Sequence, residues 1–183
     1  FGLFLFGIGE ALLITANIGV SPWFVLHQGL AFKTGYSIGI TTFIVSVFVL
    51  IFWFPLKQKP GIGTILNAIF ISVVIDVSLL FLPYPDEFSL QLMQVITGVL
   101  IIGIGSGYYL GANLGPGPRD GLMTGINKQT KQSLALIRTV LELSAVAIGF
   151  YLGGIVGIGT IIYAIGIGFS VSLGLFVIGK FYK

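Results

Sequence analysis

The stretch that decides the fold is ANIGVSP at residues 16–22, because it returns as ANLGPGP at residues 112–118, 96 positions later. At the same offset and without a gap, GIGTI at residues 61–65 matches GIGTI at residues 157–161. Chance coincidences of Gly and Ile would not align two separate motifs in one register. Self-similarity at a fixed period is typical of a repeat architecture, so the sequence predicts two structural repeats.

The composition of the whole chain excludes a soluble protein. Of its 183 residues, 56% are hydrophobic and 8% are charged, whereas a soluble domain carries about 25% charged residues. So little polar surface cannot cover a globule in water, and we expect an integral membrane protein whose surroundings are the lipid bilayer. The same numbers argue against a soluble enzyme, and nine Lys and Arg against six Asp and Glu are too few to bind a nucleic acid.

Each predicted repeat contains three long apolar segments and one short segment. The repeats are residues 1–84 and 85–183; the long segments are 1–17, 37–54 and 62–82, then 88–113, 133–152 and 158–179. Crossing about 30 Å of hydrocarbon takes about 20 helical residues. The short segments, 22–32 and 118–129, reach only ~18 Å at 1.5 Å per residue. The predicted fold class is therefore an all-α membrane protein with six transmembrane helices and two short re-entrant or broken helices.

Three crossings per repeat would place the second repeat upside down relative to the first. Loop lysines agree with this topology: if Lys57 and Lys59 are inside, six lysines are inside and only Lys33 is outside, with the acidic loop at residues 83–87. An excess of lysine on the inner side is the positive-inside rule. If the short segments also crossed, the split would be five to two. The sequence therefore favours two inverted three-helix repeats.

Ionisable residues within apolar spans are costly, so each of them indicates a functional site. The candidate substrate-binding residues are Glu10, Asp76, Arg119, Asp120, Arg138 and Glu142, together with Asn17 and Asn113 of the repeated motif. Arg119 and Asp120 open the second short segment, and broken helices in transporters often direct their N-termini at the substrate. We expect Arg119, Asp120, Arg138 and Glu142 to approach one another near the pseudo-two-fold axis, with Glu10 or Asp76 contributing.

Two alternatives stay open for these charges. The segment that begins at Arg119 could be an interfacial amphipathic helix, with its arginine at the lipid headgroups. Arg138 and Glu142 lie four residues apart on one helix face and could form a purely structural ion pair. The chain has no HExxH motif, no catalytic triad, no metal-ligand spacing and no cysteine. We therefore expect no enzyme activity, no cofactor and no bound metal.

Two runs carry a resemblance to a known family. GPGPRDGLM at residues 115–123 and LGGIVGIGT at residues 152–160 are its most specific parts, and the similarity covers essentially the whole chain. The sequence resembles the YczE/YitT-type family of bacterial membrane proteins. The resemblance implies a multi-pass protein of the bacterial cytoplasmic membrane and points to no particular substrate.

The expected function is that of a small permease or channel, which moves a polar solute or ion through a site between the repeats. Inverted repeats with broken helices are common among alternating-access transporters. A substrate-capture subunit of a larger importer and a non-transporting scaffold or regulator are the alternatives, and a homo-oligomer is compatible with all three. The charge of the substrate stays open, because two arginines suit an anion whereas four carboxylates suit a cation or proton coupling.

Overall fold

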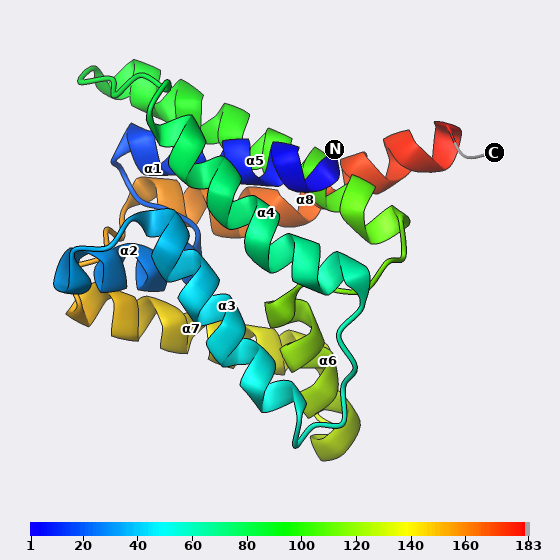
Figure 1. The fold of residues 1–183 in the computed structure, drawn as a ribbon. Coiled ribbons are helices and arrows are strands. Elements are labelled where there is room, and N and C mark those ends of the chain that lie inside the picture. The colour runs from blue at the N-terminus through cyan, green and yellow to red at the C-terminus, as the bar shows by residue number, and fades with distance from the viewer. Residues whose placement is uncertain (182–183) are drawn as a thin grey trace.

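Eight α-helices and no strand make up residues 1–181, which are the residues that the computed structural model describes (Figure 1). The helices are α1 (Gly2–Ala16), α2 (Pro22–Thr34), α3 (Ile38–Trp53), α4 (Ile62–Leu79), α5 (Phe88–Gly111), α6 (Pro118–Thr130), α7 (Leu134–Tyr151) and α8 (Ile158–Phe181). This confirms the all-α fold class. Lys183 and the side chain of Lys180, both assigned to the inner side by the charge argument, lie outside this description.

Four of the described helices, α4, α5, α7 and α8, are long and apolar enough to cross a membrane. Helices α2 and α3 pass the same test only together, as a pair bent by 115° at their junction. Helix α1 is apolar but contains only 15 residues. The structure thus has four or five candidate spans, and six crossings stay a prediction.

The repeated motif forms the same helix break twice. Asn17 and Asn113 have φ values of 57° and 50°, and Gly19 and Gly115 have φ values of 114° and 117°. Asn tolerates the left-handed region and Gly enters it without steric cost. A proline then opens α2 and α6 at the first helical position, where its missing N–H has no intrahelical partner to lose. The motif therefore ends one helix and starts the next.

Helix boundaries follow the 96-residue offset. Helices α2 and α6 begin and end 96 positions apart, α3 and α7 begin 96 apart, and so do α4 and α8. The contacts between these halves are reciprocal. Gly63 N–H donates to the Leu114 carbonyl over 2.8 Å, and its counterpart Gly159 N–H donates to the Ile18 carbonyl over 2.8 Å. Such exchanged contacts are what a two-fold relation produces.

The first helices of the two halves, α1 and α5, run in opposite directions. A Cβ built on Gly2 near the start of α1 would meet Gly105 in the second half of α5, and one built on Gly9 would meet Gly98 in the first half. Thr15 at the end of α1 accepts a hydrogen bond from Gln94 near the start of α5. Helices α1 and α5 are thus antiparallel neighbours, and small residues let their backbones approach.

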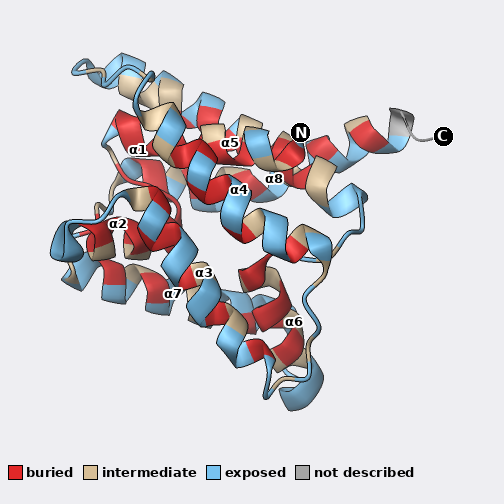
Figure 2. Cartoon of the chain, in the orientation of Figure 1, coloured by how far each residue is buried: buried red, intermediate tan, exposed pale blue. Residues whose placement is uncertain are grey.

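The two short helices pack inside the protein, each against the other repeat. Gly149 of α7 lies against the backbone of Val25 in α2, and in the counterpart contact Trp53 of α3 fills the space beside Gly121 in α6. The Trp53 indole N–H donates to the Pro118 carbonyl over 2.9 Å. Buried residues accordingly cover much of α2 and α6 (Figure 2). This burial argues against the alternative of an interfacial helix lying on lipid.

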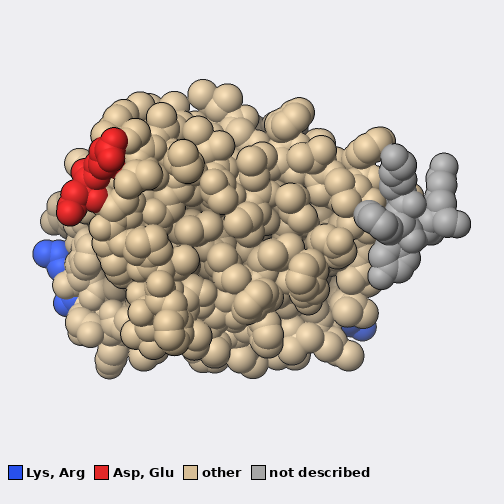
Figure 3. Space-filling model, turned by 90° about the horizontal axis from the view of Figure 1, so that it is seen from above, with Lys and Arg blue, Asp and Glu red and all other residues tan. Residues whose placement is uncertain are grey.

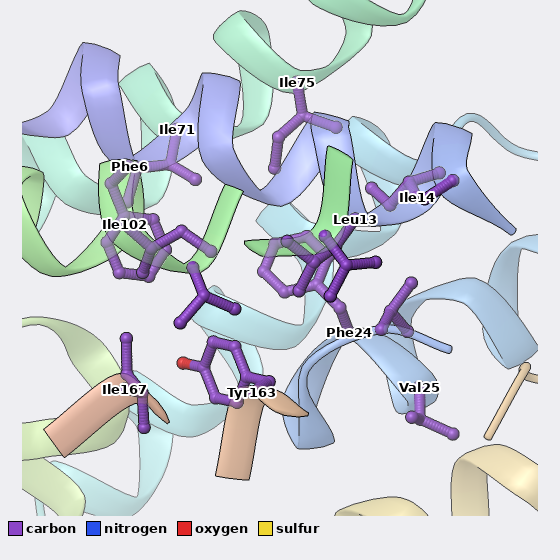
Figure 4. Packing of buried hydrophobic residues seen from close by; sticks show 14 residues of the cluster. Phe6, Leu13, Ile14, Phe24, Val25, Ile71, Ile75, Ile102, Tyr163 and Ile167 are labelled. Carbon is purple, nitrogen blue, oxygen red and sulfur yellow. The ribbon is translucent and has the colours of Figure 1, made fainter. Parts of the chain in front are cut away.

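An apolar cluster joins α1, α4, α5 and α8 next to these short helices. Phe6 and Leu13 of α1, Ile102 of α5 and Tyr163 of α8 are among its buried members (Figure 4). On the surface, the face seen in Figure 3 has charged side chains only near its ends, with the acidic ones at one end. An uncharged belt between charged ends is what a bilayer-spanning protein presents.

Candidate functional site

A cavity with both polar and apolar residues in its wall lies between the two repeats, where α2 and α6 begin. It offers about 50 Å³ to the centres of water-sized molecules, enough for roughly three or four waters at 10–15 Å³ each. Helices α1 to α6 all contribute to its wall. The polar residues of the wall are Trp23, His27, Thr42, Ser46, Asn67, Tyr109, Arg119 and Asp120.

The first turn of α2 brings an indole to the cavity. Trp23 is 7% exposed, and its Nε1 is buried with no hydrogen-bond acceptor among the described residues. A buried N–H without a partner costs about 1–3 kcal/mol, so native proteins rarely leave one unless water or a ligand supplies the acceptor. Trp23 therefore brings a donor without a protein acceptor to a residue of the cavity wall.

One turn later, His27 faces the cavity in a defined tautomer. The Thr42 hydroxyl donates to the Ile38 carbonyl over 2.7 Å, so it accepts from His27 Nδ1, which lies 3.1 Å away. In the neutral ring, Nδ1 then carries the proton and Nε2 is left as an acceptor. His27 is consequently a hydrogen-bond acceptor toward the cavity as well as a packing residue against Phe24.

The first turn of α6 supplies the charges. Asp120 accepts from the Tyr109 hydroxyl of α5 over 2.6 Å. The Arg119 guanidinium lies 5.5 Å from the centre of the Phe6 ring, a distance at which a cation is attracted to an aromatic face. It is also within electrostatic range of Asp120, Glu10, Tyr109 and Tyr163. Arg119 is thus the cation at the centre of this group.

Glu10 occupies the corresponding place at the start of α2. Its side chain is fully buried, and the Ser21 hydroxyl lies 2.9 and 3.0 Å from its two oxygens, donating to the carboxylate. Ser21 is the N-cap of α2, so the carboxylate lies at the positive end of this helix. At the 96-residue offset Glu10 corresponds to Ser106 and Ser21 to Gly117. The second repeat lacks this carboxylate-hydroxyl pair.

The other predicted site residues lie apart from the cavity. Asp76 accepts from the Ser37 hydroxyl over 2.5 Å and from Gly39 N–H over 2.7 Å, which caps the start of α3. It lines a separate, mostly apolar groove of about 400 Å³ between α3 and α4. Asn17 and Asn113 are exposed and form the left-handed turns of the two breaks.

Arg138 does not turn toward Arg119. Its Nε donates to Glu142 over 2.8 Å along α7, and its side chain is 51% exposed, because residues four apart on a helix are natural partners. Glu142 lies within electrostatic range of Tyr163, which in turn borders Arg119. The structure therefore brings Glu10, Arg119 and Asp120 together and leaves the Arg138–Glu142 pair at the edge of that group.

Comparison with known proteins places the chain in a family. Residues 1–174 match the model of a family of unknown function, DUF6198. The chain belongs to this family. It is 39% identical over 180 residues to an uncharacterized protein of Haemophilus influenzae, covering 98% of this chain and 83% of the relative.

Two Bacillus subtilis proteins are also similar to this DUF6198 member. The uncharacterized membrane protein YczE is 33% identical over 166 residues, which are 90% of this chain and 77% of YczE, and YyaS is 27% identical over 165 residues, 88% and 82%. The YczE match confirms the resemblance drawn from residues 115–123 and 152–160. No solved structure gives a significant match. With its apolar helices, the chain is a membrane protein with transmembrane helices.

Several cavity residues of this DUF6198 member were not among the predicted site residues. Trp23, Ser46, Asn67 and Tyr109 are uncharged, and sequence reasoning gave weight to charges. A usable signal existed: Ser46 and Asn67 are isolated polar residues in otherwise apolar segments. Trp23 is the counterpart of Arg119 at the repeat offset. Comparing the two repeats position by position would have singled out Trp23.

Proposed function

We propose that this protein is a small membrane permease or channel, which moves a small polar solute or ion through the cavity between its repeats. The observation that carries the proposal is the cavity itself, lined by the first turns of two broken helices and by a buried indole N–H without a partner. Irregular backbone at membrane depth is tolerated where it is buried or lines a cavity. In transporters, the N-termini of such half-helices point at the substrate. The proposal involves no catalytic reaction.

The proposed topology has six crossings in two inverted repeats, residues 1–84 and 85–183, in the bacterial cytoplasmic membrane. Antiparallel α1 and α5 support the inversion. The ends of α3 and α6 lie together, because the Gln129 amide donates to the Pro55 carbonyl over 2.9 Å. This contact gathers the loops that carry Lys57, Lys59 and Lys131 at one end, as the positive-inside rule requires.

Helices α1 and α3, which are shorter than a usual membrane span, fit this topology if the bilayer thins locally. Their 15 and 16 residues reach roughly 22–24 Å at 1.5 Å per residue. A span shorter than the hydrocarbon is accommodated by bilayer thinning at a modest cost per ångström. Crossing by α1 and α3 is therefore compatible with their lengths.

Repeat counterparts indicate how the cavity would open to the other side. Thr42 and Ser46 of α3 line the cavity, and at the 96-residue offset they correspond to Arg138 and Glu142 of α7. If the two repeats exchange conformations, Arg138 and Glu142 would line the second chamber. Arg119 and Trp23 are counterparts of each other and would face both chambers. This gives the surface ion pair a role in an alternating mechanism.

The proposal is tested by measuring solute flux through a variant in which a larger side chain fills the cavity. Ser46→Trp adds an indole to a cavity that holds a few waters, and we expect it to reduce flux at least tenfold. Its control is Ile44→Trp, on the same helix at a position that is 42% exposed and points to lipid in the proposed topology, which we expect to change flux less than twofold. The measurement is swelling of proteoliposomes in iso-osmotic urea, ammonium chloride and ammonium nitrate.

Three results of that measurement would contradict the proposal. Equal swelling of protein-containing and empty vesicles in every solute favours a scaffold. Equal flux through both variants places the path elsewhere in the molecule. Flux that appears only after an ATPase module is added favours the subunit of a larger importer.

A further inference from the structure

We infer that the cavity binds a small monovalent anion, and that each anion bound is accompanied by a proton on Glu10. The inference rests on the proposed function, since it names the substrate class of the same site. It is carried by three features of the cavity: the unpaired groups on its wall, its size and the count of charges around Arg119.

The groups at this site that are not matched by an acceptor or a counter-ion are mainly donors. Trp23 Nε1–H has no acceptor, and within the described chain Arg119 has the Tyr163 hydroxyl as a neutral partner but forms no salt bridge. The N-cap of α6 is Gly117, so no side chain caps this helix, and the backbone N–H groups of Arg119 and Asp120 in its first turn lack intrahelical acceptors. Indole, guanidinium and helix N-terminus together need a ligand that accepts hydrogen bonds and carries negative charge.

The site has fewer hydrogen-bond acceptors than donors, and some of these acceptors already receive a hydrogen bond from the protein. The Asp120 carboxylate already accepts from the Tyr109 hydroxyl. His27 Nε2 remains as an acceptor and suits a water that accompanies the anion. With room for roughly three or four waters, the cavity admits a halide or a carboxylate of a few atoms. A sugar or a nucleotide would not fit.

The charge count requires a proton in addition. Among the residues that the structure describes, Arg119 is the cation within electrostatic range of Glu10, and Asp120 is the second carboxylate near that cation. An anion added to two ionised carboxylates and one arginine would leave two net negative charges buried together, which is strongly unfavourable in a low dielectric. A proton on Glu10 removes one of these charges.

Glu10 is placed to hold that proton. The groups that face it are Ser21 from the start of α2, Arg119 from α6 and Tyr163 from α8. Asp76 of α4 turns away to cap α3, and Tyr109 of α5 is engaged with Asp120. With neutral Glu10, the positive charge of Arg119 becomes available to the anion.

Calorimetric titration of the full-length protein in nanodiscs with sodium formate and sodium chloride tests the inference. If each anion brings one proton, affinity rises as pH falls, by up to tenfold per pH unit while free Glu10 is ionised. Titration in buffers of different ionisation enthalpy counts the protons, and we expect close to one per anion. Sodium gluconate, which is too large for the cavity, is the control salt.

Three variants identify the groups. Glu10→Gln is expected to bind anions with an affinity that no longer depends on pH, whereas Asp76→Asn, a carboxylate outside the cavity, keeps the dependence of the wild type. Trp23→Phe should weaken binding about tenfold, the value of one hydrogen bond to a charged group. If Glu10→Gln does not fold, the number of protons taken up per anion by the wild-type protein decides whether proton uptake accompanies binding.

Several outcomes would overturn the inference. These are no heat of binding with formate or chloride at any pH, equal heats with gluconate, binding without proton uptake, or heats that follow the cation when potassium replaces sodium. The permease proposal fails separately from this inference. If the protein binds anions but vesicles show no flux, the anion site is supported and the permease proposal is contradicted. If urea passes but no anion binds, this inference is overturned and the permease proposal is supported.

Discussion

Arg119→Met is expected to lower the free energy of unfolding by about 3 kcal/mol, because it removes the positive charge near two carboxylates and leaves their charge uncompensated. Arg119 is the cation within electrostatic range of Glu10 and Asp120, and Met keeps its approximate length without its charge. Both carboxylates would be left without a positive partner in the interior. The measurement is unfolding of the protein in detergent micelles, followed by circular dichroism against temperature or added SDS.

The control for this variant is Lys128→Met on the same helix. Lys128 is exposed in the last turn of α6, and such surface changes usually alter stability by less than about 0.5 kcal/mol. Arg119→Lys, which keeps the charge, should recover part of the loss. Equal stability of Arg119→Met and Lys128→Met would show that Arg119 is solvated by water and is not the centre of a buried group.

Gly103→Val is expected to cost at least about 3 kcal/mol, at the upper end of what overpacking a core costs. A Cβ on Gly103 would overlap the Cβ and the backbone carbonyl carbon of Ser170 in α8. The neighbouring contact is as tight, since a Cβ on Gly107 would lie 2.5 Å from the Gly174 carbonyl carbon. Helices α5 and α8 would have to separate along their common face. The readouts are the yield of monodisperse protein and its thermal stability in detergent.

Gly168→Val supplies the matched control. Gly168 lies in α8, and a Cβ there would meet nothing within 4 Å. Both variants carry the same intrinsic difference between Gly and Val in a helix, so their difference in stability measures the packing alone. Comparable stability of the two variants would mean that α5 and α8 do not pack as the structure shows.

The sequence predicted the helix breaks and short helices well because their signals are local. The ANxGxxP motif contains the residues that a left-handed turn and a proline-first helix need, and α2 and α6 begin at Pro22 and Pro118 as expected. From the cost of burying charge, sequence reasoning also named Glu10, Arg119 and Asp120 among the candidate site residues, and Arg119 lies within electrostatic range of both carboxylates.

The partners of the other predicted site residues depend on tertiary contacts, which the sequence did not reveal. Asp76 is a lone carboxylate in an apolar segment, and only the fold shows that it caps α3 through Ser37 and Gly39. Arg138 forms an ion pair with Glu142 along α7 and does not reach Arg119. These partners depend on the angles at which helices cross, which hydrophobic patterning does not specify.

The sequence likewise did not predict that uncharged residues line the cavity. Trp23 and Asn67 line one cavity only because the fold places α2 and α4 on the wall of the same space beside the start of α6. Helices α1 and α3 agree with the predicted segments to within one residue at each end.

The measurement that tests the account most directly is the labelling of single cysteines in membrane vesicles of both orientations, which the absence of native cysteine makes possible. Lys33→Cys and Lys128→Cys mark the two ends of the molecule, and Ser46→Cys lies in the cavity wall. With a small, charged methanethiosulfonate reagent, we predict that Lys33→Cys reacts from one face only and Lys128→Cys from the opposite face only. Ser46→Cys should react from one face only, the face to which the chamber that it lines opens. Labelling of Lys33→Cys and Lys128→Cys from the same face, or no reaction of Ser46→Cys from either face, would contradict a cavity that opens alternately across an inverted repeat.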